Sequence, residues 1–398
     1  MLKFAILCSA LLIGCEQSNT ADHQDSASDS ETEIETADAT TDSANQTDSA
    51  NPNQRTTDDD TETASDTDNS PAIFSKYGNL STLAGACHIE DKGINGWQTS
   101  FEGGPATQAE LSRPHYAMAD NTGNIYIADK DAHAVRMVDT NGNIHTIAGT
   151  SVAGNGPDVA TTATQSALNG PNGLWVLGDG TVYIVDLNNN KIRRRRTDEK
   201  METVVTDEGG ISLGRAVWVS EDESVLYYSS GSVVKKWTPK EGITIFATGF
   251  NGLGALMMGA DGNLMVADRV GNAVYRVTPD GTAQRVAGTG AETSILGSGA
   301  PATSVALAGV RAIWVLAEGD YFIATHEGSQ VWYVDTDGII HLFVDGADND
   351  GHAGDGAPFN APGPKVSEVR GIACDREGNL IITENDCGYI RRVERFAE

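Results

Sequence analysis

Apolar and polar residues alternate in short runs along most of the chain, from about residue 75 to its end. These runs are separated by turns rich in glycine, aspartate and asparagine. Such alternation is typical of β-strands with one buried face, and two runs joined by a polar turn predict a hairpin. Well-preserved pairs of runs begin at Gly123, Gly180, Gly262, Gly319 and Gly378, and a degenerate pair begins at Ser224. The pattern predicts an all-β domain built from one repeated unit.

Each repeated unit contains two further strands. A first strand precedes every hairpin, as in YAMAD and GLWVL, and a fourth strand follows a tight turn, as in NGNIHTIAGT. One aligned apolar position recurs at intervals of 40 to 59 residues, and the longer intervals carry insertions; it is occupied by Val135, Ile192, Val234, Val274, Val331 and Ile390. Six units of four antiparallel strands predict a six-bladed β-propeller.

The last unit needs a strand from elsewhere, because the chain ends after its third strand, YIRRVERF. The N-terminal segment NLSTLAGA, residues 79–86, matches the fourth strands of other units, so we expect it to complete the last blade and remove an open sheet edge. Cys87 follows this strand, and Cys387 lies in the turn between the second and third strands of the same blade. Both therefore fall on one edge of the sheet, which predicts a Cys87–Cys387 disulfide. Cys374 is predicted to be a buried thiol.

The repeat resembles a known family. Its Gly-Asn-hydrophobic-Tyr-Ile/Val-Ala-Asp hairpin, its Asn-x-Val/Ile-Arg third strand and its GGPAT-type loop, residues 103–107, are similar to NHL repeats of the bacterial and teneurin type. The resemblance covers essentially all of residues 75–396. It implies the propeller fold and leaves the activity open, because a fold does not determine a function.

The first residues have the features of an export signal. An apolar run after Lys3 ends in Leu12-Ile13-Gly14-Cys15, which resembles the lipobox of bacterial lipoproteins. This resemblance implies that residues 1–14 are a signal peptide and that Cys15 is acylated, with the lipid bilayer as partner. The residue after Cys15 is Glu16 rather than aspartate, which favours the outer membrane, on its periplasmic or cell-surface side. An ordinary secretory signal with a chance cysteine is the alternative.

Residues 15–70 have a different composition. After Cys15 this segment contains sixteen acidic residues, one basic residue, Arg55, and no aromatic residue. It cannot bury enough apolar area to offset the entropy of ordering, so we predict a disordered acidic linker ahead of a propeller at residues 71–398. The formal net charge of the whole chain is −29, which excludes nucleic acid as a partner.

The start of each first strand is predicted to surround one mouth of the central channel, on the face that also carries the long insertions. The residues at this position are His115, Asn172, Arg215, Leu253, Arg311 and Arg370. Three arginines, a histidine and an asparagine around one opening could bind a carboxylate, a phosphate or a sugar acid, because guanidinium groups suit planar anions. Alternatively, each arginine could pair internally with a carboxylate that ends a second strand; these are Asp129, Asp186, Asp268 and Glu384.

Histidines and one acidic loop raise the question of a metal. His88, His115, His326 and His352 are weak candidate ligands, because no two of them have helical or hairpin ligand spacing. The insertion DNDGHAGDG, residues 348–356, is rich in calcium-type ligands without forming an EF-hand. We therefore expect no cofactor, with calcium or zinc as the alternative.

Other repeated residues are interpreted as packing. Leu111, Leu168 and Leu307 align in three insertions, and Trp175, Trp218 and Trp314 occupy one position of three first strands. A feature that recurs in several blades belongs to the scaffold before it belongs to a ligand site.

These observations favour a binding or interaction module over an enzyme, because no nucleophile, base and orienting acid occur at recognisable spacing. The ligand or protein partner of the propeller face is not identified by the sequence. The alternative is a lactonase- or lyase-like enzyme, metal-dependent or not, since some NHL-like propellers catalyse such reactions. Those enzymes carry metal ligands, acids or histidines on several inner strands, whereas only His115 stands at the channel mouth here.

Overall fold

The computed structural model describes residues 70–88, 93–347 and 352–396. The chain divides into two units, Met1–Ser65 and Asp66–Glu398, and all described residues belong to the second. The expected signal peptide, Cys15, nearly all of the acidic linker and the first four residues of the DNDGHAGDG segment lie outside the described residues. Within the described part of the chain, no helix is long and apolar enough to cross a membrane.

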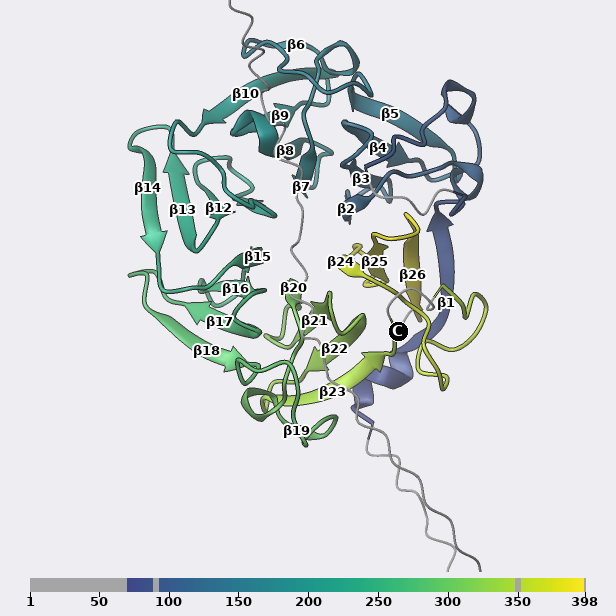
Figure 1. Cartoon of the computed structure of the whole chain (residues 1–398), viewed down its shortest axis with the longest axis vertical. Coiled ribbons are helices and arrows are strands. Elements are labelled where there is room, and N and C mark those ends of the chain that lie inside the picture. The colour runs from purple at the N-terminus through teal and green to yellow at the C-terminus, as the bar shows by residue number, and fades with distance from the viewer. Residues whose placement is uncertain (1–69, 89–92, 348–351, 397–398) are drawn as a thin grey trace, which may run out of the picture. The chain divides into compact units, whose positions relative to one another are not determined.

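Six antiparallel sheets surround a central axis and form a six-bladed β-propeller (Figure 1). Blade one consists of β2 (Pro114–Ala119), β3 (Ile125–Asp129), β4 (Ala134–Val138) and β5 (Ile144–Gly149). Blade two consists of β7 (Pro171–Val176), β8 (Val182–Asp186), β9 (Lys191–Arg195) and β10 (Lys200–Thr206). Blade three consists of β11 (Val217–Val219), β12 (Leu226–Ser230), β13 (Val233–Thr238) and β14 (Gly242–Ala247).

Blades four to six follow the same order, with the first strand innermost. Blade four consists of β15 (Leu253–Met258), β16 (Leu264–Asp268), β17 (Ala273–Val277) and β18 (Ala283–Ala287). Blade five consists of β20 (Val310–Val315), β21 (Tyr321–Thr325), β22 (Gln330–Val334) and β23 (Ile339–Val344). Blade six consists of β24 (Val369–Cys374), β25 (Leu380–Glu384), β26 (Ile390–Arg395) and β1 (Tyr77–Ala84).

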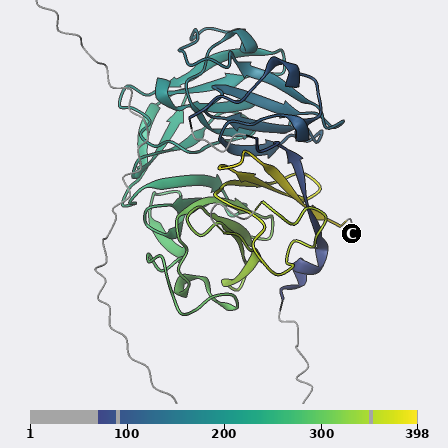
Figure 2. The ribbon, with the colours of Figure 1, turned by 45° about the vertical axis from the view of Figure 1, so that its right-hand side comes forward.

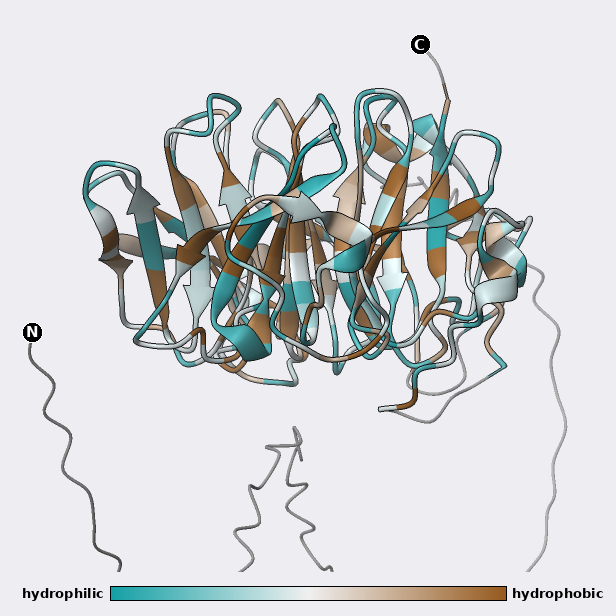
Figure 3. Cartoon of the chain, turned by 90° about the horizontal axis from the view of Figure 1, so that it is seen from above, coloured by the Kyte–Doolittle hydropathy of each residue, from teal (hydrophilic) through white to brown (hydrophobic). Residues whose placement is uncertain are grey.

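The insertions add short elements to this frame. The two-residue strands β6 (Thr161–Thr162) and β19 (Ala300–Pro301) extend blades two and five at their outer edges. The helical segments of the described residues are 3₁₀ turns: η1 (Ala72–Lys76), η2 (Thr99–Phe101), η3 (Ala106–Gln108), η4 (Ala163–Gln165), η5 (Leu187–Asn189) and η6 (Ala302–Ser304). Both propeller faces are mainly hydrophilic loops, and the apolar residues concentrate in the strands (Figure 3).

The N-terminal strand closes the ring, as the sequence predicted. β1 pairs antiparallel with β26, with Leu80 opposite Val393 and Thr82 opposite Arg391. Figure 2 shows β1 beside the yellow strands of blade six. The predicted Cys87–Cys387 disulfide is present, with the two Cα atoms 4.7 Å apart.

The core lies between neighbouring blades, where alternate strand residues are buried. The six aligned positions of the repeat are all fully buried: Val135, Ile192, Val234, Val274, Val331 and Ile390. Leu111, Leu168 and Leu307 are also buried, which confirms that the repeated insertions pack onto the blades. Cys374 was predicted to be a buried thiol; it is free but only partly buried, and desolvation raises the pKa of its thiol.

Candidate binding site at the channel mouth

Each first strand starts on the propeller face that carries the insertions, which we call the loop face. The pairing of Pro114 with Asp129 and of Val310 with Thr325 places the start of the first strand beside the end of the second. The opposite face, where the turns between first and second strands lie, we call the turn face. The mouth of the channel on the loop face is therefore bordered by the starts of the six innermost strands.

A bulge falls at this border in five blades. The pairing register skips one residue between Pro114 and Tyr116, and equivalent skips occur in β7, β15, β20 and β24. A bulge leaves one residue unpaired and re-aims its side chain, and bulges are common near functional sites. The skipped residues of blades one, two, five and six are His115, Asn172, Arg311 and Arg370.

The expected position in blade four was wrong by one residue. Leu253 pairs with Asp268 as Pro114 pairs with Asp129, so the equivalent of His115 is Gly254 rather than Leu253. A Cβ atom at Gly254 would lie 2.3 Å from the carbonyl oxygen of Arg311. No side chain fits there without moving the backbone of blade five, so five side chains and one glycine form the border.

Four of these five side chains are almost fully buried, while Arg215 is partly exposed; His115, Asn172, Arg311 and Arg370 each expose 4% or less. Both ring nitrogens of His115 and both Nη atoms of Arg311 are buried without a hydrogen-bond partner among the described residues. Asn172 donates from Nδ2 to the carbonyl of Gly214 at 2.7 Å, and its Oδ1 atom has no partner within the described ranges. Buried polar groups are normally satisfied, so such a cluster calls for an explanation.

Positive charge dominates the surroundings of these groups. Burial, followed by the charges of Lys130, Arg370, Arg311 and Arg113, lowers the pKa of His115 well below its usual value, so its imidazole is neutral at pH 7. Burial and the like charges of Arg215, Arg370 and Arg269 also lower the pKa of Arg311, and Glu327 offsets part of this effect. An anion between His115 and Arg311 would relieve this repulsion.

The carboxylates that end the second strands bond to other groups of the described residues. Three of them hold buried arginines of the third strands: the pairs are Arg136–Asp129 at 3.1 Å, Arg193–Asp186 at 3.0 Å and Arg391–Glu384 at 2.9 Å. Asp268 accepts hydrogen bonds from the backbone N–H groups of Gly252 and Gly271. For Arg311, whose Nη atoms have no hydrogen-bond partner among the described residues, the internal pairing suggested by the sequence is not found.

Some internal pairing exists at the mouth, through residues that the sequence did not single out. Arg370 lies 3.4 Å from Glu368, which immediately precedes β24, and Arg269 lies 2.7 Å from Glu327. Lys130 and Arg269 directly follow the end of a second strand, and Glu327 lies two residues beyond one. Their position in the repeat is the signal that could have identified them, because the same turn borders the channel in every blade.

The four candidate metal ligands do not come together. His326 lies 3.7 Å from Glu368, and the backbone N–H of His88 donates to Glu110. Among the residues that the structure describes, no three histidine, cysteine, aspartate or glutamate side chains are arranged to hold a metal ion. Asp355 of the DNDGHAGDG segment instead pairs with Arg391 at 2.7 Å.

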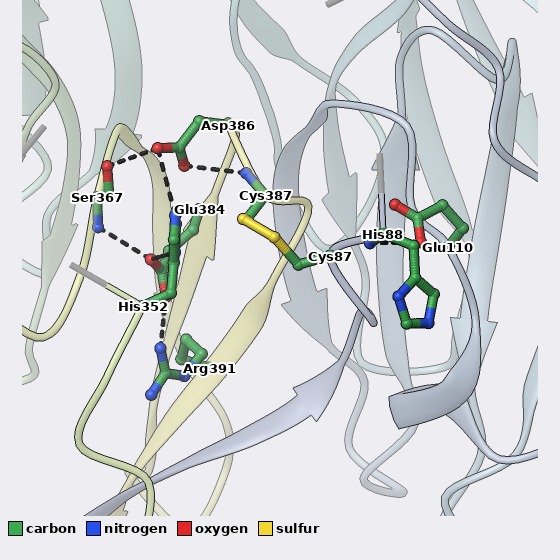
Figure 4. Close-up of a disulfide and its surroundings, with 9 residues drawn as sticks. All are labelled: Cys87, His88, Glu110, His352, Ser367, Glu384, Asp386, Cys387 and Arg391. Carbon is green, nitrogen blue, oxygen red and sulfur yellow. Dashed lines mark hydrogen bonds and ion pairs between the residues drawn. A yellow bond between two sulfur atoms is a disulfide. The ribbon is translucent and has the colours of Figure 1, made fainter. Parts of the chain in front are cut away.

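His352 is part of a separate polar cluster next to the disulfide (Figure 4). Its Nδ1 atom is 2.9 Å from Glu384, and its Nε2 atom is 3.4 Å from Asp386. Burial lowers the pKa of His352, but Asp386 and Glu384 outweigh burial and raise it to about 9. His352 is therefore mainly an imidazolium at neutral pH.

Three tryptophans of the inner strands meet across the axis. The rings of Trp175 and Trp314 are stacked with centroids 6.1 Å apart, and Trp218 lies 6.2 Å from Trp175. They are three residues further along their strands than the border residues, or roughly 10 Å deeper. The sequence predicted packing at this position, and the rings do pack on one another. Their convergence gives the polar mouth an aromatic floor.

Comparisons with known proteins support the fold. No model of a protein family and no curated protein matches this sequence. A protein of unknown function from Bacteroides thetaiotaomicron has a similar structure, with a TM-score of 0.62, 16% identity, and coverage of 79% of this chain and 75% of that one. An auxiliary nutrient binding protein from the same species gives a TM-score of 0.59 at 13% identity, over 80% and 76% of the two chains.

A gluconolactonase from Xanthomonas campestris is also similar, with a TM-score of 0.52 at 13% identity, over 82% of this chain and 94% of that one. At these identities the likeness shows the propeller fold alone. The chemistry of the site must be argued from its own residues.

Proposed function

We propose that this protein is an extracytoplasmic binding protein whose channel mouth takes an anionic ligand, such as a carboxylate or a sugar acid. The observation that carries the proposal is the buried guanidinium of Arg311, which faces like charges and has unpartnered Nη atoms within the described residues. Two adjacent Nη donors match the two oxygens of a carboxylate. The neutral His115 and Asn172 Oδ1 could bond hydroxyl groups of the same ligand.

The proposed location rests on other features. A disulfide persists in an oxidising compartment, which supports export of the chain. The lipobox-like Leu12–Cys15 supports anchoring through an acylated cysteine. We expect the protein to appear in the membrane fraction of its cells, and a Cys15→Ser variant to appear in the soluble exported fraction. An unchanged distribution of this variant would contradict lipid anchoring at Cys15.

Calorimetric titration with phosphate, D-gluconate and D-glucuronate tests the binding proposal. We expect at least one of these anions to bind, and Arg311→Met to weaken its binding about 10- to 100-fold, because a hydrogen bond to a charged group contributes roughly 1.5–3 kcal/mol. The matched control is Arg285→Met on β18, an exposed arginine that donates to the Thr289 carbonyl. This control should bind the anion as tightly as the unmodified protein.

Two results would contradict the proposal. One is the absence of binding by all three anions to protein whose circular dichroism shows an intact β-fold. The other is equal anion affinity of Arg311→Met and the unmodified protein.

A further inference from the structure

A cavity opens on the turn face, between blades five and six. It has a volume of about 590 Å³ and is lined by the turns that follow β20 and β24 and by η1. Sites for small molecules usually measure roughly 300–1,000 Å³. The cavity is therefore large enough for a ligand of the size of a monosaccharide, on the face opposite the channel mouth.

One wall of this cavity is aromatic. Trp314 lines it, and the same indole stacks on Trp175 in the floor of the channel, which fixes the orientation of the ring. Ile73 of η1 and Leu316 extend the apolar wall. A fixed indole surface suits the apolar C–H face of a sugar ring, because such contact buries area on both partners with little loss of side-chain freedom.

A buried carboxylate supplies a directed acceptor. Asp320 lines the cavity, exposes 6% of its surface, and accepts a hydrogen bond at Oδ2 from the Tyr333 hydroxyl at 2.7 Å. Its other oxygen, Oδ1, is buried and has no hydrogen-bond partner in the described part of the chain. The Tyr333 bond fixes the carboxylate, so Oδ1 is positioned to accept from a hydroxyl group.

The charges around the cavity balance. Its lining contains three basic and three acidic side chains: Lys76, Arg376, Arg395, Glu318, Asp320 and Asp375. The channel mouth, in contrast, gathers arginines with few carboxylates. A site with balanced charge gives no electrostatic preference for an anion, and its many donors and acceptors suit a neutral polyhydroxylated molecule.

We propose that this turn-face cavity binds a neutral sugar, with the sugar ring against Trp314 and one hydroxyl donating to Asp320 Oδ1. The cavity shares no border residue with the channel mouth. The proposal does not rest on the anion site, although Trp314 belongs both to the cavity wall and to the floor of the channel.

Saturation-transfer NMR and calorimetry on the full-length protein test this proposal. The probes are methyl β-D-glucopyranoside, methyl β-D-galactopyranoside and N-acetyl-D-glucosamine. We expect at least one to bind with a change in tryptophan fluorescence. Asp320→Ala should weaken that binding at least about tenfold, because it removes the directed acceptor. Arg311→Met, at the channel mouth, should leave the sugar affinity unchanged.

Asp280→Ala is the matched control, because Asp280 is an exposed aspartate in a turn of blade four on the same face. Circular dichroism and a melting curve establish that each variant is folded, and Asp320→Leu, which is similar in shape and has no oxygen acceptor, replaces Asp320→Ala if the latter unfolds. The proposal is overturned if none of the three sugars binds at up to about 50 mM, well above a millimolar Kd. It is also overturned if the folded Asp320 variant keeps full affinity, or if Arg311→Met abolishes sugar binding.

Discussion

Removing the Cys87–Cys387 disulfide should lower the free energy of unfolding, because it increases the conformational entropy of the unfolded chain. The two cysteines are 300 residues apart in sequence, so the bond links nearly the whole propeller into one loop. In the loop-entropy model, opening a loop of this length frees chain entropy worth about 5–6 kcal/mol at 25 °C. The native hydrogen bonds between β1 and β26 remain in the variant, so the loss comes almost entirely from the unfolded chain.

This loss is large relative to the stability of a typical domain, about 5–15 kcal/mol. We expect the Cys87→Ser/Cys387→Ser variant to fold at low temperature and to unfold at a much lower guanidinium concentration than the oxidised protein. The measurement is equilibrium unfolding in guanidinium chloride, followed by tryptophan fluorescence. Cys374→Ser, which removes the free thiol of β24, is the control and should change the free energy of unfolding far less.

The reasoning also predicts where the variant opens first. Without the disulfide, the seam where β1 joins blade six is held by noncovalent contacts: β1 pairs with β26, and its backbone also forms hydrogen bonds with residues 356–359. Amide hydrogens of β1 should then exchange faster than those of β25. A loss of free energy below about 1 kcal/mol in the double variant would refute the loop-entropy argument. Uniform acceleration of exchange in all six blades would refute the assignment of the seam.

Two further predictions concern buried charges. The pKa of His352 is raised to about 9 from an unfolded value of 6.5, so the protonated side chain should stabilise the fold by about 3 kcal/mol at most. This stabilisation should be complete below pH 6.5 and disappear as the pH rises through 9, so that the unfolding free energies of wild type and His352→Ala converge over this range. A difference between them that does not depend on pH would contradict the assignment. Asp129→Ala should lower the free energy of unfolding in urea by about 3–5 kcal/mol, because it leaves the charge of the fully buried Arg136 uncompensated. A smaller decrease in this free energy for Asp129→Ala than for the isosteric Asp129→Asn would contradict this reasoning.

The fold was predictable because its signals are local. Alternation within each strand and the recurrence of Val135, Ile192 and their equivalents depend on short stretches that repeat six times. The closing strand and the disulfide followed from counting strands in the last unit. Neither conclusion required knowledge of distances between blades.

The site was predicted less well, for two reasons. The blade-four position was misaligned by one residue: residues 255–258 of β15 align with residues 116–119 of β2, which places Gly254 rather than Leu253 opposite His115. The partner of each buried carboxylate depends on which neighbour its side chain reaches. Here a weak signal existed, because Asp129 precedes Arg136 by seven residues, and the other two pairs, Asp186–Arg193 and Glu384–Arg391, have the same spacing.

The point where the chain joins the propeller has a mechanical consequence. η1 leads into β1 on the turn face, and β1 runs from there toward the loop face, where Cys87 meets Cys387. If Cys15 is held in a membrane, a pull on the chain reaches the propeller at its turn face, through η1 and β1. The same tension loads β1 along its length against β26. The disulfide at the far end of β1 links this strand covalently to blade six, so it prevents the strand from being pulled out of the ring.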